Sequence, residues 1–503
     1  MPCVLAIDQS TSATKAMFFD EQGNRLDRES LEHQQHYPQP GWVEHDAEEI
    51  WQNLLAVTSA LVARNPGRVD ELSCISITNQ RETIVVFERA TGRPLHPAIV
   101  WQCRRSAELC SMHDSLGHGR LIHARTGLRL DAYFSGSKLQ WLVQNRPELS
   151  AKLASGEALI GTIDAYLIYR LTGGKVFATD STNASRTLLF DIGRLRWDEE
   201  LCGLFEVPLS ALPEVRDSES RFGETTLGGV LGDPRPIAGV MGDSQAALFA
   251  QRCFEPGTAK VTFGTGSSVL LNIGAKPQFS KRGVVTALAW VRSGAPVYAF
   301  EGIIINSAAT LKWLQNQLGL VQDVAEIEAL AGELSDAGGV FLVPAFSGLG
   351  LPHWEPEARA AITGLSDYSD RRHVARAALE SMAYQLRDAL DAMQAESGVA
   401  LRSVRADGGP TANRLLMQFT ADITETELAV SAAPDCSALG AALMGLLGLG
   451  VHSSLEDVPK MGHDDLVFRP TMSSSDVQSQ LDGWRRAVHQ VLSGVAEHSH
   501  AGD

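Results

Sequence analysis

No segment of the sequence is rich in lysine and arginine, and the 60 acidic residues outnumber the 43 basic ones. The resulting net charge of −17 repels nucleic acids and anionic membrane surfaces over long range. We therefore expect no nucleic-acid partner for this chain.

Long hydrophobic runs are also missing. The longest apolar stretch, residues 438–451, has 14 residues, whereas a membrane span needs about 20. It predicts a buried helix, and no membrane insertion is expected. The first residues have no basic region ahead of an apolar one, and Asp8 interrupts the first apolar run, so we expect no secretory signal.

Cysteine is sparse, with seven scattered residues. An odd, scattered set in a long chain argues against a disulfide framework and is typical of reduced thiols. Together with the missing signal, this predicts a cytoplasmic location.

The remaining composition, 44% hydrophobic and 20% charged residues, is typical of a globular protein. At about 150 residues per domain, 503 residues predict two to four domains. A strand–turn–strand pattern occurs twice, over residues 4–20 and again over 259–273. Judged from these hairpins alone, a duplicated domain and chance are about equally plausible.

Strand-like and helix-like stretches alternate along the chain, which indicates an α/β fold. A boundary near residue 250 gives an N-terminal domain of residues 1–250 and a C-terminal domain of residues 251–496, with a cleft between them. Residues 497–503 are expected to form a loose tail. We expect strands at 71–77 and 83–87, and helices at 139–153, 164–171, 308–318, 373–396 and 412–424.

Both hairpin turns are suited to phosphate. The first places Asp8 at a strand end, followed by hydroxyl side chains and then Lys15. Backbone N–H and hydroxyl groups can bind phosphate oxygens there, and Asp8 can hold hydrated Mg²⁺. The second turn, residues 264–266, is Gly-Thr-Gly. Each turn alone is also typical of a plain hairpin, but two turns facing one cleft favour a nucleotide. The sequence contains neither a P-loop nor the His-Arg-Asp and Asp-Phe-Gly elements of protein kinases.

Two further polar positions are candidates for chemistry. Asp243 follows Gly242 at the end of a predicted strand, where an aspartate can simply cap a helix but where open α/β sheets also place catalytic groups. Arg81 and Glu82 lie between two predicted strands. One interpretation is an ordinary surface ion pair. The other is that the backbone turns between them, so that both side chains bind vicinal hydroxyls of one ligand as donor and acceptor.

Longer motifs resemble the FGGY family of carbohydrate kinases. Residues 133–145, Tyr-Phe-Ser-Gly-Ser-Lys-Leu-Gln-Trp-Leu-Val-Gln-Asn, resemble the first signature of that family, and residues 360–380 resemble the second. The resemblance covers nearly the whole chain. Stretches similar to the glycerol-kinase branch of the family lie at 41–46, 78–83, 99–105, 182–187 and 344–350.

The resemblance implies an α/β fold of two actin-like (ribonuclease-H-like) domains with a catalytic cleft between them. It implies an enzyme that uses ATP and Mg²⁺ to phosphorylate a primary hydroxyl of a small polyol. Asp243 matches the general base, and Asp8 and Asp243 match the metal-associated carboxylates. The implied polyol-binding residues are Arg81, Glu82, Trp101, Tyr133, Asp243 and Ser244. The implied nucleotide-binding residues are Thr11, Ser12, Lys15, Thr265, Ala308, Lys312, Gly409 and Asn413.

Departures from the glycerol-kinase pattern leave the acceptor open. Lys15 replaces an arginine, Ser244 a glutamine and Ser268 a phenylalanine, while Ala308 and Lys312 replace a glycine and a glutamine. We expect glycerol, converted to glycerol 3-phosphate, as the leading acceptor, with a four- or five-carbon polyol or ketose as the alternative. The alternative of a different class is a non-catalytic actin-like ATPase that drives assembly. A homo-oligomer is among the assemblies that the sequence allows.

Overall fold

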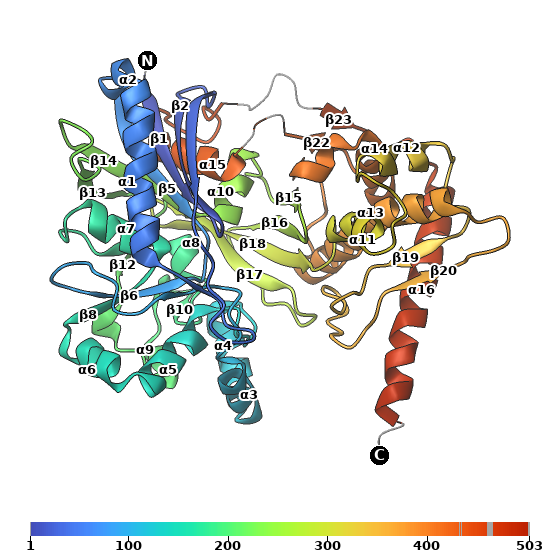
Figure 1. Cartoon of the computed structure of the whole chain (residues 1–503), viewed down its shortest axis with the longest axis horizontal. Coiled ribbons are helices and arrows are strands. Elements are labelled where there is room, and N and C mark those ends of the chain that lie inside the picture. Colours follow the sequence, from blue (N-terminus) through green and yellow to red (C-terminus); the bar gives the residue numbers. More distant parts are fainter. Residues whose placement is uncertain (1, 432, 434, 460–465, 501–503) are drawn as a thin grey trace.

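Two large mixed sheets organise the computed structural model, which describes residues 2–431, 433, 435–459 and 466–500 (Figure 1). The first sheet belongs to the N-terminal half of the chain. Its strands are β1 (Cys3–Gln9), β2 (Ala13–Asp20), β3 (Arg25–Glu32), β5 (Leu72–Asn79), β13 (Arg221–Thr225) and β14 (Arg235–Gly242). Their spatial order is β13-β14-β5-β1-β2-β3.

The second sheet belongs to the C-terminal half. Its strands are β15 (Thr258–Phe263), β16 (Ser267–Gly274), β17 (Val285–Arg292), β18 (Ala295–Ile304), β21 (Ser403–Asp407), β22 (Leu428–Val430) and β23 (Leu466–Phe468). Their order is β17-β18-β16-β15-β21-β22-β23.

The two sheets repeat one topology. In each, an antiparallel hairpin (β1–β2 or β15–β16) is extended on one side by an antiparallel strand (β3 or β18) and on the other by two parallel strands and a final antiparallel one. The second sheet has one strand more, because β17 pairs antiparallel with β18 at its edge. The two predicted hairpins therefore occupy equivalent places in two related units, and the α/β prediction of two actin-like domains is confirmed.

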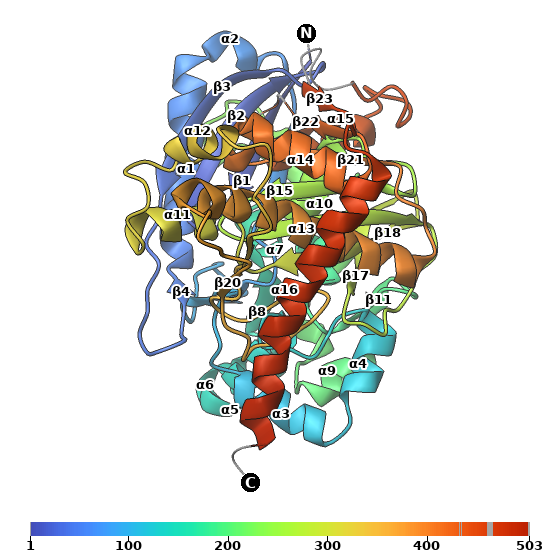
Figure 2. The ribbon, with the colours of Figure 1, turned by 90° about the vertical axis from the view of Figure 1, so that its right-hand side faces the viewer.

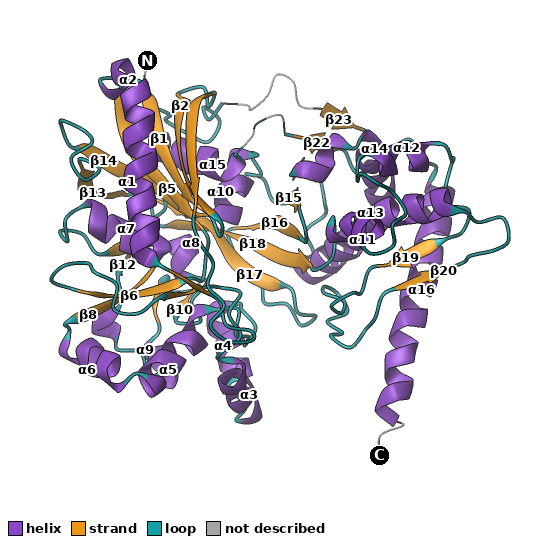
Figure 3. Cartoon of the chain, in the orientation of Figure 1, coloured by secondary structure: helices purple, strands orange, loops and turns teal. Residues whose placement is uncertain are grey.

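Helices cover both faces of the first sheet (Figure 3). The outer face packs against α1 (Ala47–Arg64) and α7 (Ile163–Leu171). The inner face packs against α10 (Asp243–Ala250) and α15 (Cys436–Gly448), which also contact β17 and β18 of the second sheet. Gly440 permits this arrangement, because a Cβ there would lie 1.8 Å from the Ala246 carbonyl oxygen of α10. Residues 438–448 of the apolar stretch thus lie in a buried helix that joins the two halves, and the last three residues of the stretch follow the end of this helix.

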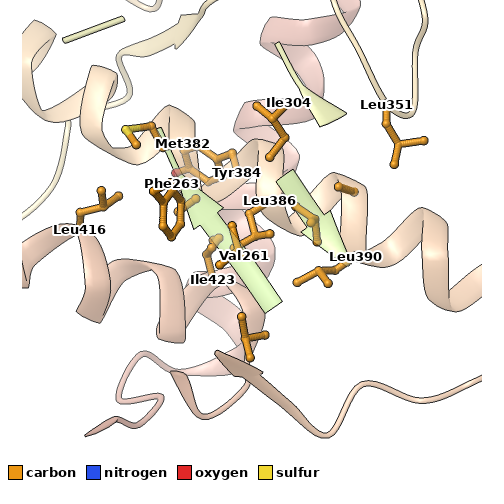
Figure 4. Close-up of a cluster of buried hydrophobic side chains, with 14 of the residues drawn as sticks. Val261, Phe263, Ile304, Leu351, Met382, Tyr384, Leu386, Leu390, Leu416 and Ile423 are labelled. Atoms are coloured by element: carbon orange, nitrogen blue, oxygen red, sulfur yellow. The ribbon is translucent and has the colours of Figure 1, made fainter. Parts of the chain in front are cut away.

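The C-terminal half has its own core around α13 (Arg371–Ser397), where α14 (Arg414–Thr424) and β15 pack against it (Figure 4). α13 begins at a capping box formed by Asp370 and His373, and ends at Gly398 in the left-handed conformation (φ 65°). α16 (Ser474–His500) runs along the outside of this half (Figure 2). The first four residues of the predicted tail therefore continue a helix, and residues 501–503 lie outside the described residues.

Residues 84–212, together with the short strand β4, build a smaller lobe on the N-terminal half. Its sheet contains β4 (Glu44–His45), β6 (Ile84–Glu88), β7 (Ala98–Ile99) and β8 (Ala158–Thr162). Its helices are α3 (Ala107–Ser115), α4 (Gly119–Thr126), α5 (Ser135–Asn145), α6 (Pro147–Ser155), α8 (Ser181–Ala184) and α9 (Glu199–Leu204). The single helix predicted at 139–153 is wrong, because Pro147 starts a new helix after Arg146 leaves helical geometry.

The remaining elements are short. They are α2 (Pro66–Val69), β9 (Ala178–Asp180), β10 (Phe190–Asp191), β11 (Arg196–Trp197), β12 (Glu214–Arg216), α11 (Ala309–Asn316), α12 (Glu326–Gly332), β19 (Phe341–Val343) and β20 (Ala361–Thr363), with 3-10 turns at Leu209–Ala211 and Gly409–Ala412. No helix among the described residues has both the length and the apolar character needed to cross a membrane. All seven cysteines are buried and unpaired.

Candidate active site

Two adjoining cavities lie between the halves of the chain. The first, of about 600 Å³, lies between the β1–β2 and β15–β16 hairpins and is called the hairpin cavity; Asp8, Lys15, Thr262, Asp407 and Gly408 are among its lining residues. The second, of about 630 Å³, is called the aromatic cavity, and its lining includes Thr11, Arg81, Glu82, Trp101, Tyr133, Thr265 and Glu301. Each cavity therefore combines residues from both halves.

Four residues line both cavities: Asp243, Ser244, Gly266 and Ser268. Asp243 is the first residue of α10, where Gly242 takes the N-cap position. Its side chain is 37% exposed, and its Oδ1 lies 3.1 Å from Nε of Arg81. A carboxylate held at the border of two cavities can act on a group that passes from one to the other.

A buried network of charges forms the wall of the aromatic cavity. Arg81 Nη2 donates to Glu301 Oε1 at 2.8 Å, and Arg186 Nη1 lies 2.6 Å from the other carboxylate oxygen of Glu301. Arg186 Nε also donates to Glu82 Oε1 at 2.6 Å. Two guanidinium groups thus share two buried carboxylates, and Glu301 of β18 ties the C-terminal half to this wall.

The two carboxylates of the network differ in electrostatics. Burial raises the pKa of Glu301, but the ion pairs with Arg186 and Arg81 outweigh it and hold its pKa at about 2. Burial is the larger effect at Glu82, whose pKa is raised even though Arg186 and Arg81 oppose the shift. Glu82 also has a left-handed backbone (φ 63°), and Thr83 N donates to the Arg81 carbonyl across it at 2.7 Å. The backbone turn that would let Arg81 and Glu82 reach one ligand is present, and strain of this kind is concentrated at binding sites.

Two aromatic rings form the apolar wall of the same cavity. The rings of Trp101 and Tyr133 lie 5.3 Å apart. Trp101 Nε1 donates to Thr11 Oγ1 at 3.0 Å, which fixes the indole against the first hairpin turn. Burial raises the pKa of Tyr133, so its hydroxyl stays protonated and can donate.

The first hairpin contributes a charged pair to the hairpin cavity. Asp8 and Lys15 face each other across β1 and β2, and Lys15 Nζ donates to Asp8 Oδ2 at 2.9 Å. Burial raises the pKa of Asp8, and Lys15 opposes this shift. Ser12 is exposed at the turn and lines neither cavity among the described residues.

The other predicted nucleotide residues lie around the second hairpin. The carbonyl groups of Gly264 and Thr265 accept hydrogen bonds from the backbone at Ser307, Ala308 and Ala309, so the start of α11 is attached to this turn. Lys312 lies one turn further along α11 and is exposed.

The glycine-rich segment near Gly409 reaches the hairpin cavity through neighbouring residues. Gly408 and Thr411 line it, whereas Gly409 and Asn413 are absent from the described lining. Gly408 has φ 101°, and a Cβ there would lie 1.9 Å from the Phe263 carbonyl oxygen, so only glycine fits. The Asn413 side chain accepts from Leu416 N at 2.8 Å and caps α14.

Four functional candidates lie outside the set predicted from the sequence. Arg186 and Glu301 complete the charge network, and Lys260 and Asp407 line the hairpin cavity. Glu301 carried a usable signal, because it is a lone acid in the apolar segment 297–305. Arg186 lay within a family-like stretch but received no role.

The donor set in the hairpin cavity fits Mg²⁺ that arrives with a nucleotide. Among the described residues, no group of three or more His, Cys, Asp or Glu side chains could hold a metal ion by itself. Asp8 and Asp243 both line this cavity. Protein sites for Mg²⁺ commonly use one or two carboxylates together with substrate phosphates and waters.

Comparison with known proteins identifies the family. The N-terminal domain profile of the FGGY family of carbohydrate kinases matches residues 3–250, and its C-terminal domain profile matches residues 259–449. The chain belongs to the FGGY family of carbohydrate kinases. Members are ATP-dependent phosphotransferases, so the alternative of a non-catalytic assembly module is set aside.

Individual relatives support this assignment over nearly the full length. A glycerol kinase of Desulfitobacterium hafniense is 45% identical over 489 residues, which cover 97% of this chain and 99% of that protein. The crystal structure of Plasmodium falciparum glycerol kinase with ADP is 37% identical, covers 98% of both chains and has a TM-score of 0.93. A xylulose kinase from Lactobacillus acidophilus shares the fold (TM-score 0.88, 99% of both chains) at only 19% identity.

Proposed function

We propose that this FGGY kinase transfers the γ-phosphoryl group of ATP to a primary hydroxyl of glycerol and forms glycerol 3-phosphate. The observation that carries the proposal is the position of Asp243, at the border between a cavity suited to phosphates and a cavity suited to a polyol. Relatives 45% identical over nearly the whole chain are named glycerol kinase, which supports glycerol as the acceptor.

The acceptor binds in the aromatic cavity. Arg81 donates to one of two vicinal hydroxyls and Glu82 accepts from the other, while the carbon chain lies against Trp101 and Tyr133. Because Arg81 is already fixed by Glu301 at 2.8 Å, these polar groups need little reorganisation when the polyol binds.

Phosphoryl transfer takes place at the border of the cavities. Asp243 accepts the proton of the primary hydroxyl, and the oxygen of that hydroxyl bonds to the γ-phosphorus. At the same time the bond between the γ-phosphorus and the β–γ bridging oxygen breaks. Arg81, 3.1 Å from Asp243, orients the carboxylate. The products are the phosphorylated polyol and ADP.

The nucleotide lies with its phosphates in the hairpin cavity. Thr11, Ser12 and Lys15 approach from the first hairpin and Thr265 from the second, while Ala308, Lys312, Gly409 and Asn413 lie toward the rest of the nucleotide. Asp8 and Asp243 would hold Mg²⁺ beside the phosphates. When bound, Mg²⁺ neutralises phosphate charge.

A larger acceptor is a second candidate. Ser268 lines both cavities, and its Oγ is buried without a hydrogen-bond partner among the described residues. Ser244 and Ser268 stand where the glycerol-kinase pattern has larger side chains, which favours room for a four- or five-carbon polyol or ketose.

The test is an acceptor panel. ADP formation is measured with ATP, Mg²⁺ and three- to six-carbon polyols and ketoses, with a vicinal diol that has only secondary hydroxyls as the control. We expect glycerol to give the highest kcat/KM and the control diol to give no turnover. A longer acceptor with a clearly higher kcat/KM would replace glycerol, and turnover with no acceptor at all would contradict the proposal.

We also infer a cytoplasmic location. Seven buried, unpaired cysteines support a reducing compartment, because such thiols are typical of intracellular proteins. Cell fractionation with a tagged full chain would test this location.

A further inference from the structure

Lys260 lies at the floor of the hairpin cavity. It is on β15, where side chains alternate between the two faces of the sheet. Val261 and Phe263 point into the core of the C-terminal half (Figure 4). Lys260 and Thr262 therefore point to the opposite face, and both line the hairpin cavity. Lys260 is only 1% exposed.

The ammonium group of Lys260 is in direct contact with no acid among the described residues: its charge helps to lower the pKa of Glu301, but Arg81 and Arg186 already bind that carboxylate. Within the described part of the chain, its Nζ makes no hydrogen bond and no salt bridge. Other lysines of the chain have direct partners. Lys15 forms a salt bridge with Asp8 at 2.9 Å. The buried Lys138 donates to three carbonyl groups, those of Ala132, Tyr133 (2.7 Å) and Phe134 (3.2 Å). A buried cation without partners is costly, so Lys260 is not satisfied in the manner of a structural lysine.

Nearly every carboxylate of the hairpin cavity already has a cation. The pairs are Asp8 with Lys15, Asp243 with Arg81, and Asp435 with Arg25. The exception is Asp407, whose Oδ2 accepts from Gln251 at 2.6 Å and whose Oδ1 has no partner among the described residues. Asp407 pairs in register with Thr262, two residues along β15 from Lys260, and forms no salt bridge with Lys260. The positive charge of Lys260 therefore remains available to a ligand in the cavity.

We propose that Lys260 is a phosphate-binding residue and that its ammonium group pairs with the phosphoryl oxygens of the nucleotide from the floor of the hairpin cavity. This inference rests on the proposed function. The ligand is an anion, because a neutral ligand would leave the buried ammonium unpaired. A fixed cation below the phosphates also stabilises the charge that shifts toward ADP during transfer, with no reorganisation of solvent.

The test compares ATP, ADP and adenosine binding by calorimetry in the full-length protein. Lys260→Met keeps the length of the side chain and removes its charge, while the exposed Lys276→Met is the matched control. We expect Lys260→Met to raise the Kd of ATP and ADP by about 10- to 100-fold and to leave adenosine within about two-fold, as losing one charge-assisted contact implies. Lys260→Arg should recover part of this loss, and Lys276→Met should resemble the wild type.

Two results would overturn the proposal. The first is an equal loss for adenosine and ATP, or no loss for ATP and ADP, in Lys260→Met. The second is restored ATP affinity in the double variant Lys260→Met/Asp407→Asn, since Lys260 would then only balance Asp407. If Lys260→Met does not fold, ATP and adenosine binding are compared in the double variant instead. Because no acceptor is present, the outcome is independent of whether glycerol is the substrate.

Discussion

At the scale of single residues, Asp243 is the group on which the proposed chemistry depends most. Asp243→Asn should lower kcat by about 100-fold or more, because the amide cannot accept the hydroxyl proton. The fold should persist, since Arg81 keeps its bonds to Glu301 (2.8 Å) and Gln245 (3.2 Å). ATP affinity should change little, because Asp8 remains to hold Mg²⁺ and the amide oxygen of the new asparagine can still face the ion. Steady-state kinetics and ATP calorimetry measure both effects, with the exposed Asp233→Asn as the control. More than about a tenth of wild-type turnover would remove Asp243 from the role of base.

Ser268 decides how tightly a short acceptor fits. Ser268→Phe should shift the ratio of kcat/KM values toward glycerol over the best longer acceptor, because a ring at the border of the cavities fills space that a longer chain would use. A change of about 10-fold is expected for an apolar contact of this size. Ser268→Ala separates loss of the hydroxyl from gain of the ring. An unchanged ratio in Ser268→Phe would end the argument for a larger acceptor.

The candidate site could be predicted from the sequence only in part. Asp8, Lys15 and Asp243 could be singled out because each stands beside a turn or at a strand end, where local patterns are informative. Arg186 could not, and Glu301 had only the signal of a lone acid in an apolar segment, because the bonds that make them part of a site join residues 104 and 220 positions apart. Lys260 was missed for a related reason, since only the packing of β15 determines which face of the strand meets the cavity.

At the scale of elements, strand and helix periods predicted most segments to within a few residues, and the failure has a local cause. The predicted helix at 139–153 had a continuous apolar period, yet Pro147 divides it into α5 and α6. The equivalence of the two sheets could be predicted only in part. The two hairpins are visible in the sequence, but the matching strand order depends on parallel pairings between distant segments, such as β1 with β5 and β15 with β21.

The attachment of α16 to α13 should depend on pH. Trp484 Nε1 of α16 donates to Asp388 Oδ2 of α13 at 2.7 Å. Burial raises the pKa of Asp388 to about 6, although this bond opposes the shift. The folded state therefore holds a proton that the unfolded state releases at lower pH, so stability from this group falls as pH rises from about 4 through 6.

Asp388→Asn should remove this dependence. Relative to the variant, the wild type should lose stability between pH 4 and 7, by at most about 3 kcal/mol for a shift of this size. Thermal unfolding followed by tryptophan fluorescence measures the difference at each pH. Asp482→Asn, an exposed carboxylate on α16, is the control. A constant difference between wild type and Asp388→Asn over this range would contradict the prediction.

At the scale of the whole molecule, the two halves are joined on one side and separated by cavities on the other. α10 and α15 form a continuous apolar core between the sheets, and Glu301 crosses to Arg81 and Arg186. The two hairpins face each other across the hairpin cavity, and their turns also line the aromatic cavity. This asymmetry allows the halves to close about the packed side while the cavities shrink around their ligands.

Acceptor binding is expected to drive that closure. The side chain of Asp243 is 37% exposed, so water competes with a hydroxyl for the γ-phosphoryl group unless the cleft closes. ATP hydrolysis without an acceptor should therefore be at least about 100-fold slower than ADP formation with glycerol, the scale of one well-positioned catalytic contribution. Small-angle scattering should show a smaller radius of gyration with glycerol and a non-hydrolysable ATP analogue than with the analogue alone. The vicinal diol without a primary hydroxyl separates the two effects, because it can fill the aromatic cavity and close the cleft without accepting phosphate. Phosphate release equally fast with and without glycerol would mean that the acceptor does not control closure.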